Sequence, residues 1–401
     1  MTSVRLEQEN QQLDGAGSKL VRFGIAAGVL GFAGGIGIAI AGGGGMSRFY
    51  QGYLVNYAYF LSLALGALFF VLIQHVTKAG WSVAVRRVAE GVSTTLALLA
   101  LLFVPIVFGM HDLFEWTHAE AIASDELIAH KTPYLNPTFF VIRWVFYFVV
   151  WIAYSSYFWL LSRQQDESGD PRLTRRMERH STHGVLLFAL TLTFAAFDLL
   201  MSLDPHWFST IFGVYYFAGG LLGFFSLLAI MLTLIQRSGR LSRSVHVEHY
   251  HDIGKFMFGF TVFWAYIAFS QYMLIWYADI PEETGWYLRR QTGQWLTVSN
   301  ILILGHFVVP FLALLSRVPK RRKGILVIMA AWILVMHWID IYWLAMPEFS
   351  QQAVPLSFVD LALLVGLGGL LVAFAGWQLG KAALIPLRDP RLDESIGLQN
   401  L

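Results

Sequence analysis

Two aspartates lie inside apolar stretches of the sequence at matching positions. Asp198 stands seven residues before Pro205, and Asp340 stands seven residues before Pro347. A carboxylate in hydrocarbon is costly, so we expect both side chains to lie inside a helix bundle or a wet cavity, as candidate functional groups. Because ionising a buried carboxyl group without a cation partner is also costly, both suit proton transfer. The competing interpretation is a carboxyl group that only donates a hydrogen bond to a neighbouring helix.

Two histidines could extend a proton path from Asp340. His337 stands one helical turn before Asp340, and His306 lies near the middle of the preceding apolar stretch. The pattern permits a relay from His306 through His337 to Asp340, bis-histidine ligation of a b-type haem, or histidines that only pack. The haem hypothesis is the weaker one, because bulky residues flank both histidines and a macrocycle needs small neighbours.

A further polar series runs along the seventh apolar stretch. His249, Asp252 and Lys255 stand at its start, and Gln271 and Asp279 stand farther along it. This order predicts a proton-collecting entrance followed by a polar path outward, and a solvated helix start is the alternative. The His, Glu and Asp residues at the start match no structural zinc spacing, so we expect no metal site.

Arg143 lies inside the outer end of the fourth apolar stretch. A long basic side chain at this depth either snorkels to the interface or pairs with Asp198 or Asp360 within the bundle. Snorkelling is the simpler arrangement, and we predict it for Arg143. Asp360, near the start of the last stretch, is interpreted as an interfacial carboxylate.

The composition places these residues in a membrane. Of the 401 residues, 56% are hydrophobic and 13% are charged, which indicates an all-α integral membrane protein. The absence of cysteine excludes disulfides, thiolate-bound iron–sulfur clusters and the C-x-x-C-H attachment of haem. Ten apolar stretches are long enough to be transmembrane helices: Val21–Gly42, Tyr50–Val76, Val92–Met110, Pro137–Ser162, Thr182–Leu203, Ile211–Gln236, Ile253–Ala278, Trp295–Ser316, Gly324–Ala345 and Leu356–Leu384.

The distribution of basic residues predicts the orientation. Basic clusters occupy the links after the second, fourth, sixth and eighth stretches, whereas the opposite links are poor in basic residues and partly acidic. By the positive-inside rule, both termini are expected on the cytoplasmic side of a multi-pass membrane protein. The polar N-terminal residues lack the pattern of a cleaved signal peptide, so they are interpreted as a cytoplasmic tail.

The eight middle stretches read as two sets of four in a parallel repeat. Tyr59 and Phe60 precede Gly66 with the offset at which Tyr216 and Phe217 precede Gly223, and the aspartate–proline pairs close both sets. The first and last stretches are glycine-rich, which favours close helix contacts. The predicted organisation is a tail at 1–20, a first helix and loop at 21–49, four-helix bundles at 50–210 and 211–350, and a last helix with a tail at 351–401.

Two segments carry a family resemblance. Residues 251–284 read HDIGKFMFGFTVFWAYIAFSQYMLIWYADIPEET, and residues 197–220 read FDLLMSLDPHWFSTIFGVYYFAGG. Both segments resemble the ActF family, which comprises membrane subunits of bacterial alternative complex III within the wider NrfD/PsrC-like group of quinol-interacting subunits. The resemblance extends over nearly the whole chain. It implies two four-helix bundles plus two flanking helices, in a bacterial inner membrane.

The resemblance also implies a partner set and a role. The partners would be the sister membrane subunit ActC, a multihaem cytochrome c, an iron–sulfur subunit, small membrane subunits, a monohaem cytochrome c and lipid, with no nucleic acid. The haems and iron–sulfur clusters would lie in those partners. No redox cofactor is expected in this chain, because it has no evident ligand set for one. The ligand that the resemblance implies is a quinone such as menaquinone.

Within such a complex, quinol oxidation needs a proton acceptor in an apolar slot. Asp198, Arg143, Tyr215 and Tyr216 are the candidates for an ancillary quinone pocket, and no catalytic residue is assigned. We expect a structural and proton-conducting subunit beside the quinol-oxidising sister subunit. A stand-alone secondary transporter and a b-haem membrane cytochrome are the alternatives.

Overall fold

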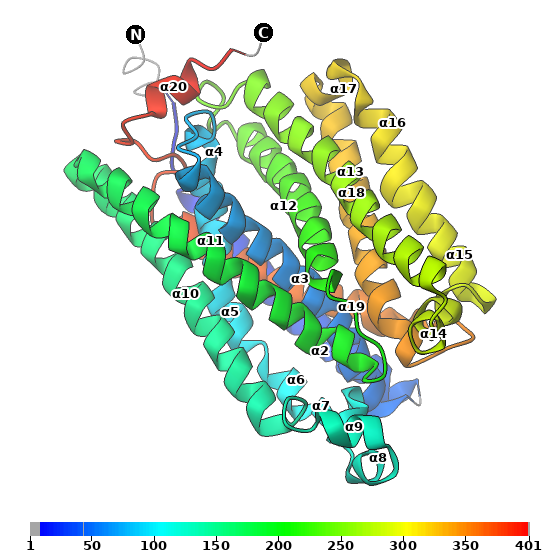
Figure 1. Ribbon diagram of the computed structural model, residues 1–401. Helices are drawn as coiled ribbons and strands as arrows, with labels where there is room; N and C mark the ends of the chain where they lie inside the picture. The colour runs from blue at the N-terminus through cyan, green and yellow to red at the C-terminus, as the bar shows by residue number, and fades with distance from the viewer. Residues whose placement is uncertain (1–8, 43, 400–401) are drawn as a thin grey trace.

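The computed structural model describes residues 9–42 and 44–399, which form a bundle of long helices (Figure 1). Within these residues, ten helical segments of 22–33 residues are apolar enough to span a membrane. The protein is therefore an all-α, multi-pass integral membrane protein. Residues 1–8 of the predicted N-terminal tail, Gly43 and the last two residues of the predicted C-terminal tail lie outside the described residues.

The ten spans follow the order expected from hydropathy. They are α2 (Gly15–Ala41), α3 (Gly45–Val76), α4 to α6 (Val83–Ser93, Leu96–Leu101 and Val104–Phe108), α10 (Pro137–Ser168), α11 (Pro171–Leu199) with η2 (Met201–Leu203), α12 (Phe212–Arg237), α13 (Val247–Ala278), α15 (Gly293–Ile301) with η3 (Leu302–Val308) and α16 (Val309–Leu315), α18 (Lys323–Ala345) with η4 (Met346–Glu348), and α19 (Phe358–Leu379). Shorter helices lie in the links: α7 (Met110–Leu113), η1 (Glu115–Thr117), α8 (Ala119–Ser124), α9 (Glu126–Lys131), α14 (Pro281–Arg290), α17 (Arg317–Arg321) and α20 (Leu392–Ile396).

Several helices extend beyond the apolar stretches, because capping residues and not hydropathy decide where they end. Asn136 caps the start of α10 by accepting a hydrogen bond from the Phe139 amide, and α10 ends at Gly169 with a φ of 68°. Asp170 then caps α11, which has Pro171 in its first turn. The basic residues predicted as a link are therefore helical.

The spans pack as two four-helix bundles with the same internal order. In the first bundle, α3 contacts α4 and α11, and α10 lies across from α3 and contacts the same two helices. In the second bundle, α12 contacts α13 and α18, and α16 with η3 contacts the same two helices. The two bundles meet at α3 and α12 (Figure 1). Gly66 permits this approach, because a Cβ there would lie 2.9 Å from the carbonyl oxygen of Gly220.

The glycine-rich first and last spans make the close helix contacts that the sequence favours, and the structure shows that they make them with each other. A Cβ on Gly24 would lie 2.5 Å from the carbonyl oxygen of Gly369, and a Cβ on Gly31 would lie 2.3 Å from the amide nitrogen of Gly366. Only glycine permits backbones this close. Helices α2 and α19 therefore form a tight pair that flanks the bundles, and Asp360 on α19 pairs with Arg48 on α3.

The bundle has two polar ends, named here after the helices that lie on them. The α20 face carries α20 and α17, and the α9 face carries α9 and α14 (Figure 1). On the α9 face, Arg290 of α14 lies over the Trp286 ring at 3.3 Å and donates to the carbonyl oxygens of Trp343 and Leu344. Burial lowers the pKa of Arg290 to about 10, and Glu348 at 3.0 Å opposes this shift. Arg290 thus fixes the end of α18, the helix that carries Asp340.

Candidate functional site

A buried polar cluster lies where α12, α13, η3 and α18 meet. We call it the Asp340 cluster; its members are Asp340, His337, His306, Tyr215 and Trp264. Each of these side chains is at most 5% exposed. His337 and Asp340 stand one turn apart on the same face of α18, as the sequence predicts. Buried polar groups in a membrane protein are expected to serve a structural or functional purpose, and the contacts distinguish the two.

Neutral donors hold the carboxyl group of Asp340. The Tyr215 hydroxyl donates to Oδ1 at 2.5 Å, and the Trp264 indole nitrogen donates to Oδ2 at 3.1 Å. Across residues 9–42 and 44–399, no lysine, arginine or histidine lies within ion-pair distance of Asp340. Because both donors are uncharged, the contacts can hold the carboxyl group in either protonation state.

His337 connects the cluster to the first bundle. Its Nε2 lies 2.8 Å from the Ser62 hydroxyl on α3, whereas its Nδ1 has no hydrogen-bond partner in the described part of the chain. A Cβ on Gly219 would lie 3.1 Å from Nδ1 of His337 and 3.5 Å from Oδ2 of Asp340, so both groups face the same point of α12. Gly223 also lacks a side chain where the imidazole of His337 packs, since a Cβ on Gly223 would lie 2.9 Å from Cδ2 of His337.

His306 lies on the π-helical turn η3, in the middle of the eighth span. Its ring stacks on Trp264 at 4.2 Å and lies 6.2 Å from the His337 ring, measured between centroids. Neither ring nitrogen of His306 has a hydrogen-bond partner among the described residues, although the side chain is fully buried. Buried polar atoms of this kind are typically satisfied by water, and π-helical turns are frequent at functional sites.

This geometry suits proton transfer and does not fit the haem hypothesis. Two imidazoles and a carboxyl group within one buried cluster provide donors and acceptors that ordered water can link. A bis-histidine haem needs both rings to direct a nitrogen at one iron between them. Nε2 of His337 is instead engaged with the Ser62 hydroxyl on α3, and the imidazole edge with Nδ1 packs against Gly219 of α12, which leaves no space there for a macrocycle.

The environment of Asp198 differs from the prediction. Arg143 does not snorkel: its Nε and Nη2 donate to the two oxygens of Asp198 at 2.9 and 2.8 Å. Tyr147 also donates to Asp198, at 2.9 Å. The long side chain was compatible with either arrangement, and the buried carboxylate on the adjacent helix decides between them, because an unpaired charge there would be far costlier. The predicted snorkelling of Arg143 is therefore wrong, and the alternative named for it, pairing with Asp198, is the one that the structure has.

The predicted grouping of two tyrosines with Asp198 is also wrong. Tyr215 donates to Asp340, and Tyr216 donates to the carbonyl oxygen of Ala58 on α3. Successive residues on a helix point about 100° apart, so the two hydroxyls reach different neighbours. Of the four candidates for a quinone pocket, the structure brings together only Asp198 and Arg143.

The predicted proton entrance lies away from the Asp340 cluster. His249 is buried at the α20 face with its Nε2 3.1 Å from the Ser395 hydroxyl, and Asp252 pairs with Lys255. Along α13, His249 is about 22 Å from Trp264 at 1.5 Å per residue. These three residues are therefore close to one another but do not contact the cluster.

Toward the α9 face, Gln271 has a buried polar partner and Asp279 does not join them. Gln271 is buried two turns beyond Trp264 on α13 and donates to the Tyr287 hydroxyl at 3.1 Å. Burial raises the pKa of Tyr287 above its usual value, and the hydrogen bond from Gln271 opposes this shift. Asp279 lies exposed at the end of α13, with a φ of 49°, and does not continue the path.

The sequence did not single out Trp264 of the cluster, the Ser62 contact of His337 or the π-helical turn that carries His306. Tryptophan and serine occur throughout the apolar stretches, so type alone does not single these residues out. The usable signal was the spacing of Gly219, Gly220 and Gly223 on α12, since a glycine-lined face indicates close approach by a neighbouring group.

Comparisons with known proteins add no assignment to this geometry. No family model matches the chain, and a search of curated proteins gives no match. The chemistry of the Asp340 cluster therefore follows from its own contacts.

Proposed function

We propose that this chain is an integral membrane subunit of a quinol-oxidising respiratory complex of the alternative complex III type, and that it conducts protons through the Asp340 cluster. Ten spans in two bundles with a flanking pair agree with the arrangement that the family resemblance implies. In this proposal the electrons pass from quinol to haems and iron–sulfur clusters in partner subunits. The chain itself supplies a scaffold and a proton site.

One observation carries the proton role. Asp340 is buried and held only by the neutral donors Tyr215 and Trp264, beside two histidines with unpartnered ring nitrogens among the described residues. A carboxyl group held in this way can gain and lose a proton without leaving a buried cation unpaired. Asp198 lacks this freedom, because protonation would leave Arg143 buried without its partner. The proton site is therefore assigned to the second bundle alone.

The proposed location is the bacterial cytoplasmic membrane with the α20 face in the cytoplasm. Basic residues concentrate in the links at that face, which supports this orientation under the positive-inside rule. Gln271 and Tyr287 then lie between the Asp340 cluster and the outer side. Protons released near the cluster would leave toward that side, where quinol-oxidising complexes deliver electrons to periplasmic acceptors.

The proton role is tested with Asp340→Asn in the assembled complex, reconstituted in vesicles. We expect proton release coupled to quinol oxidation to fall by on the order of tenfold or more, since general acid–base groups contribute about 10²–10⁴. Tyr342→Phe is the matched control, because it removes a buried hydroxyl on the same helix that has no described partner. Unchanged quinol turnover and proton release in Asp340→Asn would remove the proposal.

Membership of a complex is tested separately by purification of the tagged chain from native membranes. We expect haem-containing and iron–sulfur proteins to accompany it in fixed ratio. A chain that purifies alone would favour the secondary transporter. The π-helical break in the eighth span is the observation that keeps this candidate open, since transporter helices are often interrupted near the membrane centre. Proton-coupled solute uptake by the purified chain in vesicles would then support it.

A further inference from the structure

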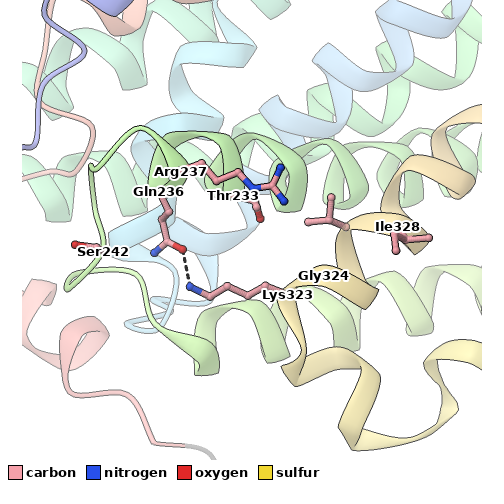
Figure 2. A pocket seen from close by; sticks show the side chains of 8 residues that line it. Thr233, Gln236, Arg237, Ser242, Lys323, Gly324 and Ile328 are labelled. Carbon is pink, nitrogen blue, oxygen red and sulfur yellow. Dashed lines mark hydrogen bonds between the residues drawn. The ribbon is translucent and has the colours of Figure 1, made fainter.

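A pocket of about 540 Å³ opens between α12 and α18 at the α20 face (Figure 2). Its wall combines two cations, Arg237 and Lys323, with the polar side chains of Thr233 and Gln236. Figure 2 shows Lys323 reaching toward Gln236, while Arg237 lies beside Thr233 on the neighbouring helix. The chemistry of this wall is suited to an anion with several oxygen acceptors.

The two cations are prepared for a ligand in different ways. Lys323 donates to Oε1 of Gln236 at 2.6 Å, and Gln236 is itself fixed because it donates to the carbonyl oxygens of Leu241 and Val245. Arg237 is exposed, and none of the described residues forms a hydrogen bond or ion pair with its side chain. The pocket thus has one positioned cation and one cation whose full hydrogen-bonding capacity is free for a ligand.

The backbone at the start of α18 adds to the positive potential. Arg322 precedes the helix and makes no side-chain capping bond, so amide groups of the first turn remain available. Gly324 lines the pocket in this first turn, and a Cβ there would meet nothing within 4 Å among the described residues. A ligand oxygen can therefore approach the helix end past a residue without a side chain.

The surroundings favour an amphipathic ligand. Arg237 ends α12 and Lys323 begins α18, so the pocket lies where the apolar spans give way to polar links. One turn deeper on the same two helices, Leu234 is 57% exposed and Ile328 is 68% exposed. Apolar side chains at this depth face acyl chains, whereas the basic side chains lie at the level of lipid headgroups.

We propose that this pocket binds the phosphate of an anionic phospholipid, with Arg237, Lys323 and the start of α18 holding the headgroup and Leu234 and Ile328 contacting the acyl chains. Free inorganic phosphate shares the anionic chemistry but cannot use the apolar contacts. The site is separate from the Asp340 cluster, and the inference does not depend on the proposed respiratory role.

The test uses the purified full chain, stripped of lipid in detergent. Thermal unfolding is followed with added phosphatidylglycerol, phosphatidylcholine or inorganic phosphate, and bound lipid is counted by native mass spectrometry. We expect phosphatidylglycerol to be retained most and to raise the unfolding temperature most. Arg237→Gln and Lys323→Gln should each weaken retention about fivefold, the ratio that corresponds to about 1 kcal/mol per basic residue near an anionic surface.

Two further variants make the test specific. Gly324→Leu keeps both charges, and no described atom lies within 4 Å of its Cβ position, so the lipid-free chain should keep its stability. The leucine side chain would block the approach to the start of α18, so lipid retention should fall. Arg179→Gln removes an exposed arginine on α11 and should change nothing. Equal retention of the two lipids, or full retention by the Arg237→Gln/Lys323→Gln double variant, would overturn the site. Stabilisation by inorganic phosphate equal to that by phosphatidylglycerol would overturn the lipid assignment.

Discussion

Arg143 and Asp198 form a bidentate ion pair between α10 and α11, with both carboxylate oxygens engaged. Asp340, at the matching place in the second bundle, is held by Tyr215 and Trp264 and by no charged group among the residues described. The two halves therefore differ at the positions that look most alike in the sequence. The first position carries a stabilising ion pair, and the proposed proton chemistry concerns only the second.

The first prediction concerns this ion pair. Arg143→Ala should destabilise the protein by about 3–5 kcal/mol, because it leaves the fully buried Asp198 without its cation. Arg143→Met combined with Asp198→Leu should recover part of this loss, since no buried charge remains. Thermal unfolding in detergent measures both. A double variant no more stable than Arg143→Ala would contradict this explanation.

The second prediction concerns the contact between α2 and α19. Gly31→Ala should destabilise the pair by about 1–3 kcal/mol, because its Cβ would lie 2.3 Å from the Gly366 amide nitrogen. Gly37→Ala on the same helix is the control, as no described atom lies within 4 Å of its Cβ position. Cleavage by a protease in the link between α2 and α3 should become faster in Gly31→Ala only. Equal cleavage of both variants would argue against the close contact.

The third prediction concerns the link between His337 and Asp340. Gly219→Ala places a methyl group 3.0 Å from the His337 ring, so the ring must shift by a few tenths of an ångström while both titratable groups remain. If the cluster conducts protons, coupled proton release should fall severalfold with the complex still assembled. Gly259→Ala on α13 has open space around its Cβ and should behave as wild type. Normal proton release in Gly219→Ala would mean that the approach at Gly219 has no role in transfer.

The fourth prediction concerns pH and the α9 face. The partly exposed Asp125 carboxylate caps α9 and lies 2.6 Å from Nε2 of His206. The contact with His206, and after it the capping bond from the Ile128 amide, lower the pKa of Asp125 below the usual 3.8. Their contribution is present above pH 3.8 and is lost as the pH falls through the lower folded pKa. The Ile128 amide should lose protection from hydrogen exchange in that range, after correction for intrinsic rates. In Asp125→Asn, which cannot ionise, its protection should not change with pH there.

Hydropathy and glycine spacing were enough to predict the ten spans, their order and close packing of the first and last helices, although not that these two helices pack against each other. Each of these depends on a one-dimensional signal: apolar length for a span, and a run of small residues for a close contact. The placement of His337 and Asp340 on one face was predictable for the same reason, because helical periodicity fixes it. Helix ends were less predictable, since Asn136 and Gly169 set them through local hydrogen bonds and backbone conformation.

Partner assignments needed the structure, because they depend on how each helix is rotated about its axis. Tyr215 and Tyr216 are adjacent in sequence, yet one contacts Asp340 and the other contacts α3. The π-helical turn at His306 has no signature in apolar periodicity, and it changes which side of the eighth span faces inward. Rotation in a membrane is set by packing against neighbours, which a single sequence does not display.

The glycine contacts between α2 and α19 also constrain the order of biosynthesis. Helix α2 is synthesised long before α19. Its glycine-rich face is therefore in the bilayer without its final neighbour until α19 is inserted. Most residues of the apolar window of α2 are not buried in the finished protein, so α2 can stand as a lone span until then. The pair can therefore close only after α19 has been inserted, and a chain that stops before Phe358 would leave α2 held to the bundles only through its link to α3 and its contacts with that helix.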